Sequence, residues 1–230
     1  SSCGAANYEL STNSFLPRKG YVFVKKTVNL KKCFNDKCVQ GAFVAVGSGF
    51  IVKVTYNGSY VMTASHVCAE NQSDYLQGVK IKIKLQAETL DGRMFNAIML
   101  DHNTKFDVCM MFVEDLYAGV EEVKVASCGP RPGDKIYNIA SPYGIHYEDM
   151  VPIFEGRYLG KKGFESYYTF QAAPGSSGSM ILNEKGELVG LLHSVFVKMT
   201  SIVVSANYGD LKYFIRKAIA AHEQKRVTFF

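Results

Sequence analysis

The stretch Ala173-Pro174-Gly175-Ser176-Ser177-Gly178-Ser179 lies between two short apolar runs, residues 167–172 and 180–182. Phe, Thr and Ile are enriched in these runs, which is typical of β-strands. A loop that begins with proline and contains two glycines is expected to turn tightly and to present backbone N–H groups outward. A serine hydroxyl in such a loop lies beside N–H donors that can hold an anion, as acyl transfer requires.

A base and an acid for this serine are found upstream. His66 ends the strand-like run 60–67, and Asp107 precedes the apolar run 108–113. A carboxylate beside a buried strand is costly unless it is paired and hydrogen-bonded, and a histidine N–H would satisfy it. We therefore predict that Ser177 attacks, that His66 removes its proton, and that Asp107 fixes the tautomer of the histidine. Backbone N–H groups of Gly175 and Ser177 are predicted to hold the oxyanion.

Strand-like runs recur at short intervals in two series, which predicts an all-β fold of two barrels. The first series comprises residues 21–30, 41–56, 59–67, 79–90, 93–100 and 108–113, and the second comprises residues 135–140, 151–159, 167–172, 179–182, 187–195 and 201–206. Asn57-Gly58 and Asp91-Gly92 are typical hairpin turns. Residues 208–224 have helical spacing instead, and we expect an amphipathic helix docked on the second lobe.

These patterns divide the chain into four parts: an N-terminal arm (1–20), a first barrel lobe (21–117), a second barrel lobe (118–206), and a C-terminal helix with its tail (207–230). Residues 21–225 together are expected to form one domain.

Charge and hydropathy argue against two classes of partner, nucleic acids and a membrane crossed by the chain. The net charge of +5 is mild and dispersed, so no nucleic-acid partner is predicted, and no apolar run approaches a membrane span. Lys80, Lys82 and Lys84 alternate with apolar residues, which we interpret as the protected face of an edge strand.

The six cysteines have no zinc-site spacing, so neither a metal nor a cofactor is predicted. Cys33 and Cys38 bracket a short loop, where either a disulfide or two free buried thiols would fit. A disulfide would indicate an extracytoplasmic location, periplasmic or secreted. Ser-Ser-Cys-Gly at residues 1–4 resembles a bacterial lipoprotein cleavage region, with a lipid on Cys3, although polar residues are also ordinary at a terminus.

The order His66, Asp107, Ser177 is that of the chymotrypsin-like serine proteases. The resemblance covers roughly residues 41–217 and is closest to the HtrA/Deg branch of trypsin-like proteases, here without a PDZ domain. It implies a chymotrypsin-like double β-barrel with a C-terminal α-helix and an active site between the lobes, with residues 21–225 together forming one trypsin-like peptidase domain. The motifs that carry it are Gly47-Ser48-Gly49-Phe50-Ile51, Met62-Thr63-Ala64-Ser65-His66-Val67, residues 132–144, residues 154–160 and residues 183–190.

Two departures from that branch concern the pocket: the loop before Ser177 is about two residues shorter, and Ser179 replaces a glycine. The resemblance implies that residues 168–173 and 192–196 form the pocket walls. The pocket residues would then be Gln171, Ala172, Leu192, His193 and Val195. Neither segment contains an acid, and His193 is expected to point toward Asp107, so cleavage after small or aliphatic residues is predicted.

The main hypothesis is a serine endopeptidase that acts on protein or peptide substrates. The alternatives are an inactive trypsin-like module that binds peptides or scaffolds an assembly, and a viral polyprotein-processing protease. Other side chains are assigned no role: we expect Asp101 in a solvated turn, and His102, His146 and His222 in turn-like or exposed stretches. The oligomeric state stays open.

Overall fold

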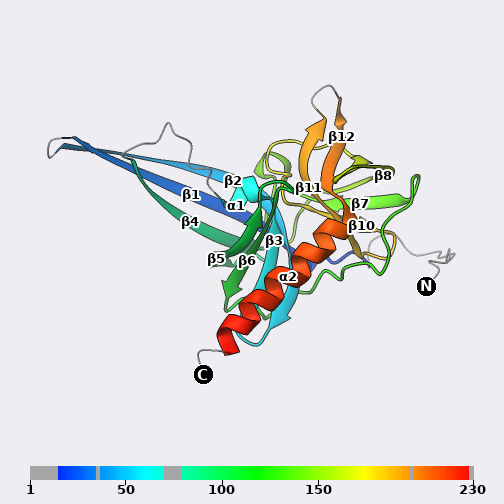
Figure 1. The fold of residues 1–230 in the computed structure, drawn as a ribbon, viewed down its shortest axis with the longest axis horizontal. Coiled ribbons are helices and arrows are strands. Elements are labelled where there is room, and N and C mark those ends of the chain that lie inside the picture. Colours follow the sequence, from blue (N-terminus) through cyan, green and yellow to red (C-terminus); the bar gives the residue numbers. More distant parts are fainter. Residues whose placement is uncertain (1–14, 35–36, 70–78, 197–198, 228–230) are drawn as a thin grey trace.

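The computed structural model describes residues 15–34, 37–69, 79–196 and 199–227. Within these residues, twelve strands form two closed antiparallel barrels, with strand orders β1-β2-β3-β6-β5-β4 and β10-β11-β12-β9-β8-β7 (Figure 1). The first barrel consists of β1 (Tyr21–Phe34), β2 (Lys37–Thr55), β3 (Gly58–Thr63), β4 (Val79–Thr89), β5 (Met94–Asn103) and β6 (Val108–Glu114). The second consists of β7 (Lys135–Ile139), β8 (Ile153–Lys162), β9 (Glu165–Thr169), β10 (Met180–Asn183), β11 (Leu188–Phe196) and β12 (Met199–Ala206). The predicted double barrel is confirmed.

The barrels close because alternate side chains of each strand point inward, where apolar residues gather. In β1, Val22, Val24 and Val28 are fully buried, while the residues between them are partly exposed or, like Lys26, hydrogen-bonded. The second barrel has a separate cluster around Tyr168, whose hydroxyl donates to the carbonyl of Val189. Alternating hydrophobicity therefore predicts these strands because it reflects the burial of one face of each strand in the barrel.

The first hairpin is longer than the sequence pattern predicts. β1 continues to Phe34 and β2 begins at Lys37, and a disulfide joins Cys33 to Cys38 across the hairpin. Of the two alternatives for these cysteines, the structure has the disulfide. The lysines at positions 31 and 32 interrupt the apolar run that marked the strand, although their backbone stays paired with β2.

The C-terminal helix α2 (Tyr208–Val227) contacts the second lobe, as expected, and also extends across the first barrel, which was not expected. Its first turn contacts the second lobe through Tyr208, whose hydroxyl donates to the carbonyl of Ala126. Its far end reaches the first barrel, where Glu223 pairs with Lys53 at 2.5 Å. Between these ends, Leu211, Phe214, Ile215 and Ala218 enter the larger hydrophobic core.

Three further expectations are corrected. His222 lies in α2 and is half-buried, with its Nδ1 3.0 Å from the Tyr60 hydroxyl, so it is neither in a turn nor fully exposed. Asp101 lies in β5 rather than in a turn, because the strand continues through a register shift after Met99. The side chain of His146 is only 4% exposed and stacks on Phe23, so it is not a surface histidine. Of the helices that the structure describes, none is both long and apolar enough to cross a membrane.

Candidate active site

The register of two neighbouring strands brings His66 and Asp107 together. Thr63, at the end of β3, is paired with Cys109 in β6. The short helix α1 (Ser65–Cys68) begins two residues after Thr63 and contains His66. Asp107 lies two residues before Cys109, in the turn between β5 and β6, with a left-handed φ of 49°. Both residues therefore lie at the same end of the first barrel.

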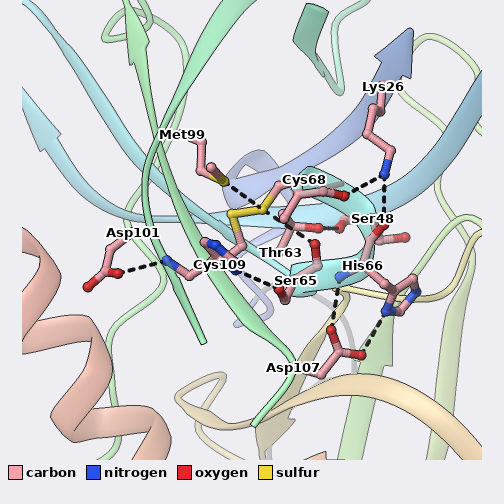
Figure 2. The surroundings of a disulfide bond; sticks show 12 residues. Lys26, Ser48, Thr63, Ser65, His66, Cys68, Met99, Asp101, Asp107 and Cys109 are labelled. Atoms are coloured by element: carbon pink, nitrogen blue, oxygen red, sulfur yellow. Dashed lines mark hydrogen bonds and ion pairs between the residues drawn. A yellow bond between two sulfur atoms is a disulfide. The ribbon is translucent and has the colours of Figure 1, made fainter. Parts of the chain in front are cut away.

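Two hydrogen bonds join this pair (Figure 2). Nδ1 of His66 lies 2.7 Å from Oδ2 of Asp107, and the backbone N–H of His66 donates to Oδ1 at 3.0 Å. Burial raises the pKa of Asp107, but the hydrogen bonds and charge of His66 outweigh this effect and hold the pKa below its usual value. An ionised Asp107 favours the tautomer with a proton on Nδ1, which leaves Nε2 as an acceptor.

The histidine is supported by groups that the sequence analysis did not identify. A disulfide joins Cys68 to Cys109, each two residues after one member of the His66–Asp107 pair (Figure 2). The buried Nζ of Lys26 donates to the carbonyls of His66 at 3.0 Å and Ala69 at 2.7 Å. The equal spacing of the two cysteines from His66 and Asp107 is the signal that could have revealed the cross-link.

The loop with Ser177 is seated against the first barrel beside the histidine turn. The carbonyl of Ser177 accepts a hydrogen bond from the Ser48 N–H at 2.8 Å. Gly178 has φ 87°, and a Cβ there would lie 2.2 Å from both the Ser48 carbonyl and the Thr63 hydroxyl. A Cβ on Gly47 would contact both Val67 and the carbonyl of Ser177. Ser177 thus comes from the second lobe and lies next to the turn that contains His66.

Within the residues that the structure describes, the Ser177 hydroxyl makes no hydrogen bond, either to His66 or to another group. In enzymes without substrate the hydrogen bonds between catalytic groups are often long, and they tighten in the complex. His66 and Asp107 are thus directly hydrogen-bonded, whereas Ser177 lies beside the turn that contains His66 without a hydrogen bond to the histidine.

The backbone of the Ser177 loop has unpaired donors where an oxyanion site was predicted. Neither the N–H of Gly175 nor that of Ser177 has an acceptor among the described residues. The flanking carbonyls are engaged: that of Pro174 accepts from Tyr143 N at 2.6 Å, and that of Gly175 accepts from the Ser48 hydroxyl at 2.9 Å. Gly175 has φ 98°, a conformation that favours glycine.

The five residues assigned to the substrate pocket do not share one environment. Leu192 is buried in the core of the second barrel, and its backbone exchanges hydrogen bonds with the Ser177 loop. Gln171 is exposed, while Ala172 and Val195 pack at the edge of the same core. His193 is separate from these, because its Nδ1 lies 3.9 Å from Oδ2 of Asp107. Burial lowers the pKa of His193 although the charge of Asp107 opposes this effect, which favours a neutral ring at neutral pH.

The remaining chemical candidates can be set aside. Cys128 is disulfide-bonded, so it is not a free thiol nucleophile. In the described part of the chain, no three His, Cys, Asp or Glu side chains are grouped as a metal site requires. Cys3 lies outside the described residues.

The disulfides at Cys33–Cys38 and Cys68–Cys109 indicate an extracytoplasmic location, because such bonds persist in oxidising compartments.

Comparison with known proteins agrees with the double-barrel fold. A family model of the trypsin-like peptidase domain matches residues 47–191. The "Probable periplasmic serine endoprotease DegP-like" of Buchnera aphidicola subsp. Baizongia pistaciae is 28% identical over 178 residues, covering 74% of this chain and 35% of the relative. The "Periplasmic pH-dependent serine endoprotease DegQ" of Escherichia coli is 26% identical over 170 residues, covering 70% and 34%. The chain thus spans about a third of the length of these relatives.

Proposed function

Since the chain belongs to the trypsin-like peptidase family and is by class a serine endopeptidase, we propose that it cleaves peptide bonds through Ser177, His66 and Asp107. The observation that carries the proposal is the His66–Asp107 hydrogen bond of 2.7 Å, at the lobe boundary where the Ser177 loop is seated. No other serine of that loop has a comparable position: Ser176 and Ser179 are buried, and their hydroxyls are hydrogen-bonded within the second lobe.

The reaction would follow from the orientation of the imidazole. Nε2 of His66 takes the proton of the Ser177 hydroxyl as its oxygen attacks the substrate carbonyl. The imidazolium that forms is stabilised by the ionised Asp107 and then gives its proton to the leaving amine. Water, activated by the same histidine, hydrolyses the acyl-enzyme and releases Ser177.

The N–H groups of Gly175 and Ser177 are proposed to stabilise the tetrahedral oxyanion. Both donors are unpaired among the described residues, and the carbonyls beside them are fixed by Ser48 and Tyr143. Donors that are already oriented lower the transition-state energy without a cost of reorganisation, and one such donor contributes about 3 kcal/mol in related sites.

We further propose cleavage after small or aliphatic residues. Residues 168–173 and 192–196 contain no Asp or Glu, and Nδ1 of His193 lies 3.9 Å from Oδ2 of Asp107. A basic substrate side chain would therefore lack a buried partner. A peptide library with every residue type at the cleaved position tests this proposal, and a sharp preference for Arg, Lys or Glu would contradict it.

The nucleophile is tested with a fluorophosphonate probe and mapping of the modified residue. We expect labelling of Ser177, no labelling of Ser177→Ala, and a fall in turnover of about 10⁴–10⁶ in that variant with little change in thermal stability. Labelling of Ser176 or Ser179 would contradict the assignment. Absence of labelling in the folded wild-type protein would favour a module without catalytic activity.

Periplasmic or secreted localisation is the finer proposal for where the chain acts. Its support is the disulfides Cys33–Cys38 and Cys68–Cys109. Cys128 is also disulfide-bonded, and Cys3 is the one remaining cysteine of the six, so the lipid expected on Cys3 is not proposed. Thiol alkylation of protein isolated without reductant tests the location: Cys33, Cys38, Cys68 and Cys109 should not react, and free thiols at these positions would contradict it.

A further inference from the structure

Three strands of the first barrel continue beyond its closed part as a sheet that projects from the body of the molecule (Figure 1). We call residues 25–34 of β1, 37–46 of β2 and 79–84 of β4 the β extension. β2 pairs with β3 only from Phe50 onward, and β4 pairs with β5 only from Leu85 onward. Within the described residues, the β extension is therefore a three-stranded sheet without strand partners at its two edges.

The two faces of the β extension differ in chemistry. Directly paired residues of antiparallel strands point to the same face, and Lys31 is opposite Lys80. By the same register, one side is a lysine face, which we define as Lys25, Lys31, Lys80, Lys82 and Lys84; Val44 and Val46 of β2 lie on the same side. The other side is an apolar face, which we define as Leu30, Val39, Phe43, Ile81 and Ile83; Lys32 and Lys37 lie on this side near the hairpin turn. Phe43 is 46% exposed and Ile83 is 38% exposed, so water reaches this face.

Protection of a sheet edge does not account for the lysine face. Edge lysines prevent pairing with other chains, which explains those on β4. Lys25 and Lys31, however, lie on β1, the central strand of the β extension, whose two edges are both paired. Like charges directly opposite each other destabilise a sheet, and the described residues of the β extension include no Asp or Glu to offset them. The lysine face is therefore suited to a ligand with many negative charges.

A shallow depression of about 510 Å³ crosses the lysine face. Its lining includes Asn29, Gln40 and Ala42 of the same face, together with Leu30, Gly41 and Ile81. Lys31, Lys80 and Lys82 line it. Ammonium groups around a depression with amide donors provide hydrogen bonds for phosphate oxygens from several directions.

We propose that the β extension binds the surface of an anionic lipid bilayer. A nucleic acid or an acidic protein would engage the lysine face and leave the apolar face in water, and a second copy of the chain would do the reverse. An anionic bilayer engages both faces, as it does with amphipathic helices, whose apolar side lies at the boundary of headgroups and acyl chains. The backbone of the sheet then lies at headgroup level, where lysine side chains extend to the phosphates. This proposal does not depend on the peptidase mechanism.

Sedimentation with vesicles tests the lysine face. The full chain should bind vesicles of phosphatidylcholine and phosphatidylglycerol, bind vesicles of phosphatidylcholine alone much more weakly, and dissociate as salt is added. The triple variant Lys31→Gln/Lys80→Gln/Lys82→Gln should bind about a hundredfold more weakly. The matched control Lys161→Gln/Lys162→Gln/Lys185→Gln removes the same charge from exposed lysines of the second barrel and should bind as wild type.

Tryptophan fluorescence tests the apolar face without removing any charge. The chain contains no Trp, so Phe43→Trp places a single reporter on the apolar face. We expect a blue shift when anionic vesicles are added, and no shift for Tyr213→Trp, which reports from an exposed position on α2. Melting temperature and hydrolysis of a soluble peptide show whether each variant is folded.

Five results would overturn the proposal. The first is that wild-type protein does not bind anionic vesicles, and the second is that both lysine triples weaken binding equally, since net charge alone would then explain the binding. The third is an unshifted Phe43→Trp spectrum on bound vesicles. The fourth is tighter binding to double-stranded DNA than to vesicles, and the fifth is a concentration-dependent dimer that Phe43→Ser abolishes. Either of the last two would assign the β extension to a different partner.

Discussion

Removal of the Cys68–Cys109 disulfide should weaken both the fold and the site, whereas removal of Cys33–Cys38 should weaken only the fold. The two cross-links differ in the length of chain that they close: their sequence separations are 41 and 5 residues. The chain-entropy relation then gives stabilisations of about 4 and about 2 kcal/mol. They also differ in place, because only Cys68–Cys109 flanks His66 and Asp107 (Figure 2).

The comparison uses two matched variants, Cys68→Ala/Cys109→Ala and Cys33→Ala/Cys38→Ala, each of which removes one disulfide and leaves no free thiol at the site. Equilibrium unfolding in urea measures the loss of stability, and kcat on a soluble peptide measures the site. We expect the first variant to lose about tenfold or more in kcat under conditions where it remains folded, because small displacements of reacting groups are costly. The second variant should retain the wild-type kcat.

Two outcomes would contradict this prediction: equal losses of kcat in the two variants, or a Cys68→Ala/Cys109→Ala protein with unchanged kcat. The first outcome would mean that the β extension, rather than the cross-link beside the histidine, controls the geometry of the site. The second would mean that the two hydrogen bonds and Lys26 hold the His66–Asp107 pair without the disulfide.

Three other perturbations test the site and its surroundings. Asp107→Asn should lower kcat by about 10⁴ at neutral pH, with Asp101→Asn as a control that retains activity. Because His66 lowers the pKa of Asp107, the stabilisation from the ionised carboxylate is complete above about pH 4 and is lost as the pH falls through the lowered pKa; urea unfolding at several pH values would show this loss. Gly175→Ala would place a Cβ 2.4 Å from the Ser141 carbonyl at a φ of 98°, so kcat should fall about a hundredfold or more, and a variant with normal kinetics would show that the loop relaxes freely. Burial lowers the pKa of His146 despite the charge of Glu88, so as the pH falls the unfolded chain binds a proton before the folded chain does, and the protein loses stability below about pH 6.5. His146→Phe should therefore be more stable than wild type at acidic pH only. A gain in stability that is independent of pH would exclude titration of His146 as the cause.

The strands were predictable because their signal is local. Alternating apolar residues and the Asn57-Gly58 and Asp91-Gly92 turns are properties of short windows, and they mark the strands of both barrels. The limits of β1 and β2 were not predictable in this way, because residues 31–34 and 37–40 lie in water and the polar residues Lys31, Lys32, Lys37 and Gln40 interrupt the apolar runs. The contact of α2 with the first barrel was also missed, since an amphipathic face shows that a helix is buried without showing every element that it covers.

Parts of the site were predictable for a similar reason. His66, Asp107 and the Ser177 loop each stand in a short motif, and the order of the motifs along the chain indicated how they would meet. The supports of the site depend on contacts that no window contains: Lys26 is 40 positions from His66, and Ser48 is 127 positions from Gly175. The burial of His146 was hidden for the same reason, because its ring stacks on Phe23, a residue of the other lobe.

The hydroxyl of Ser48 makes the geometry of the site depend on how the two lobes are aligned. This one atom, from the first barrel, lies 2.9 Å from the Gly175 carbonyl, 3.0 Å from Ser141 N and 3.1 Å from the Ser141 hydroxyl, all in the second. A slip of one barrel against the other would break these bonds while leaving every strand intact. Catalytic activity should then be lost at a lower denaturant concentration than secondary structure is, so a protein with a native circular dichroism spectrum can be an inactive enzyme.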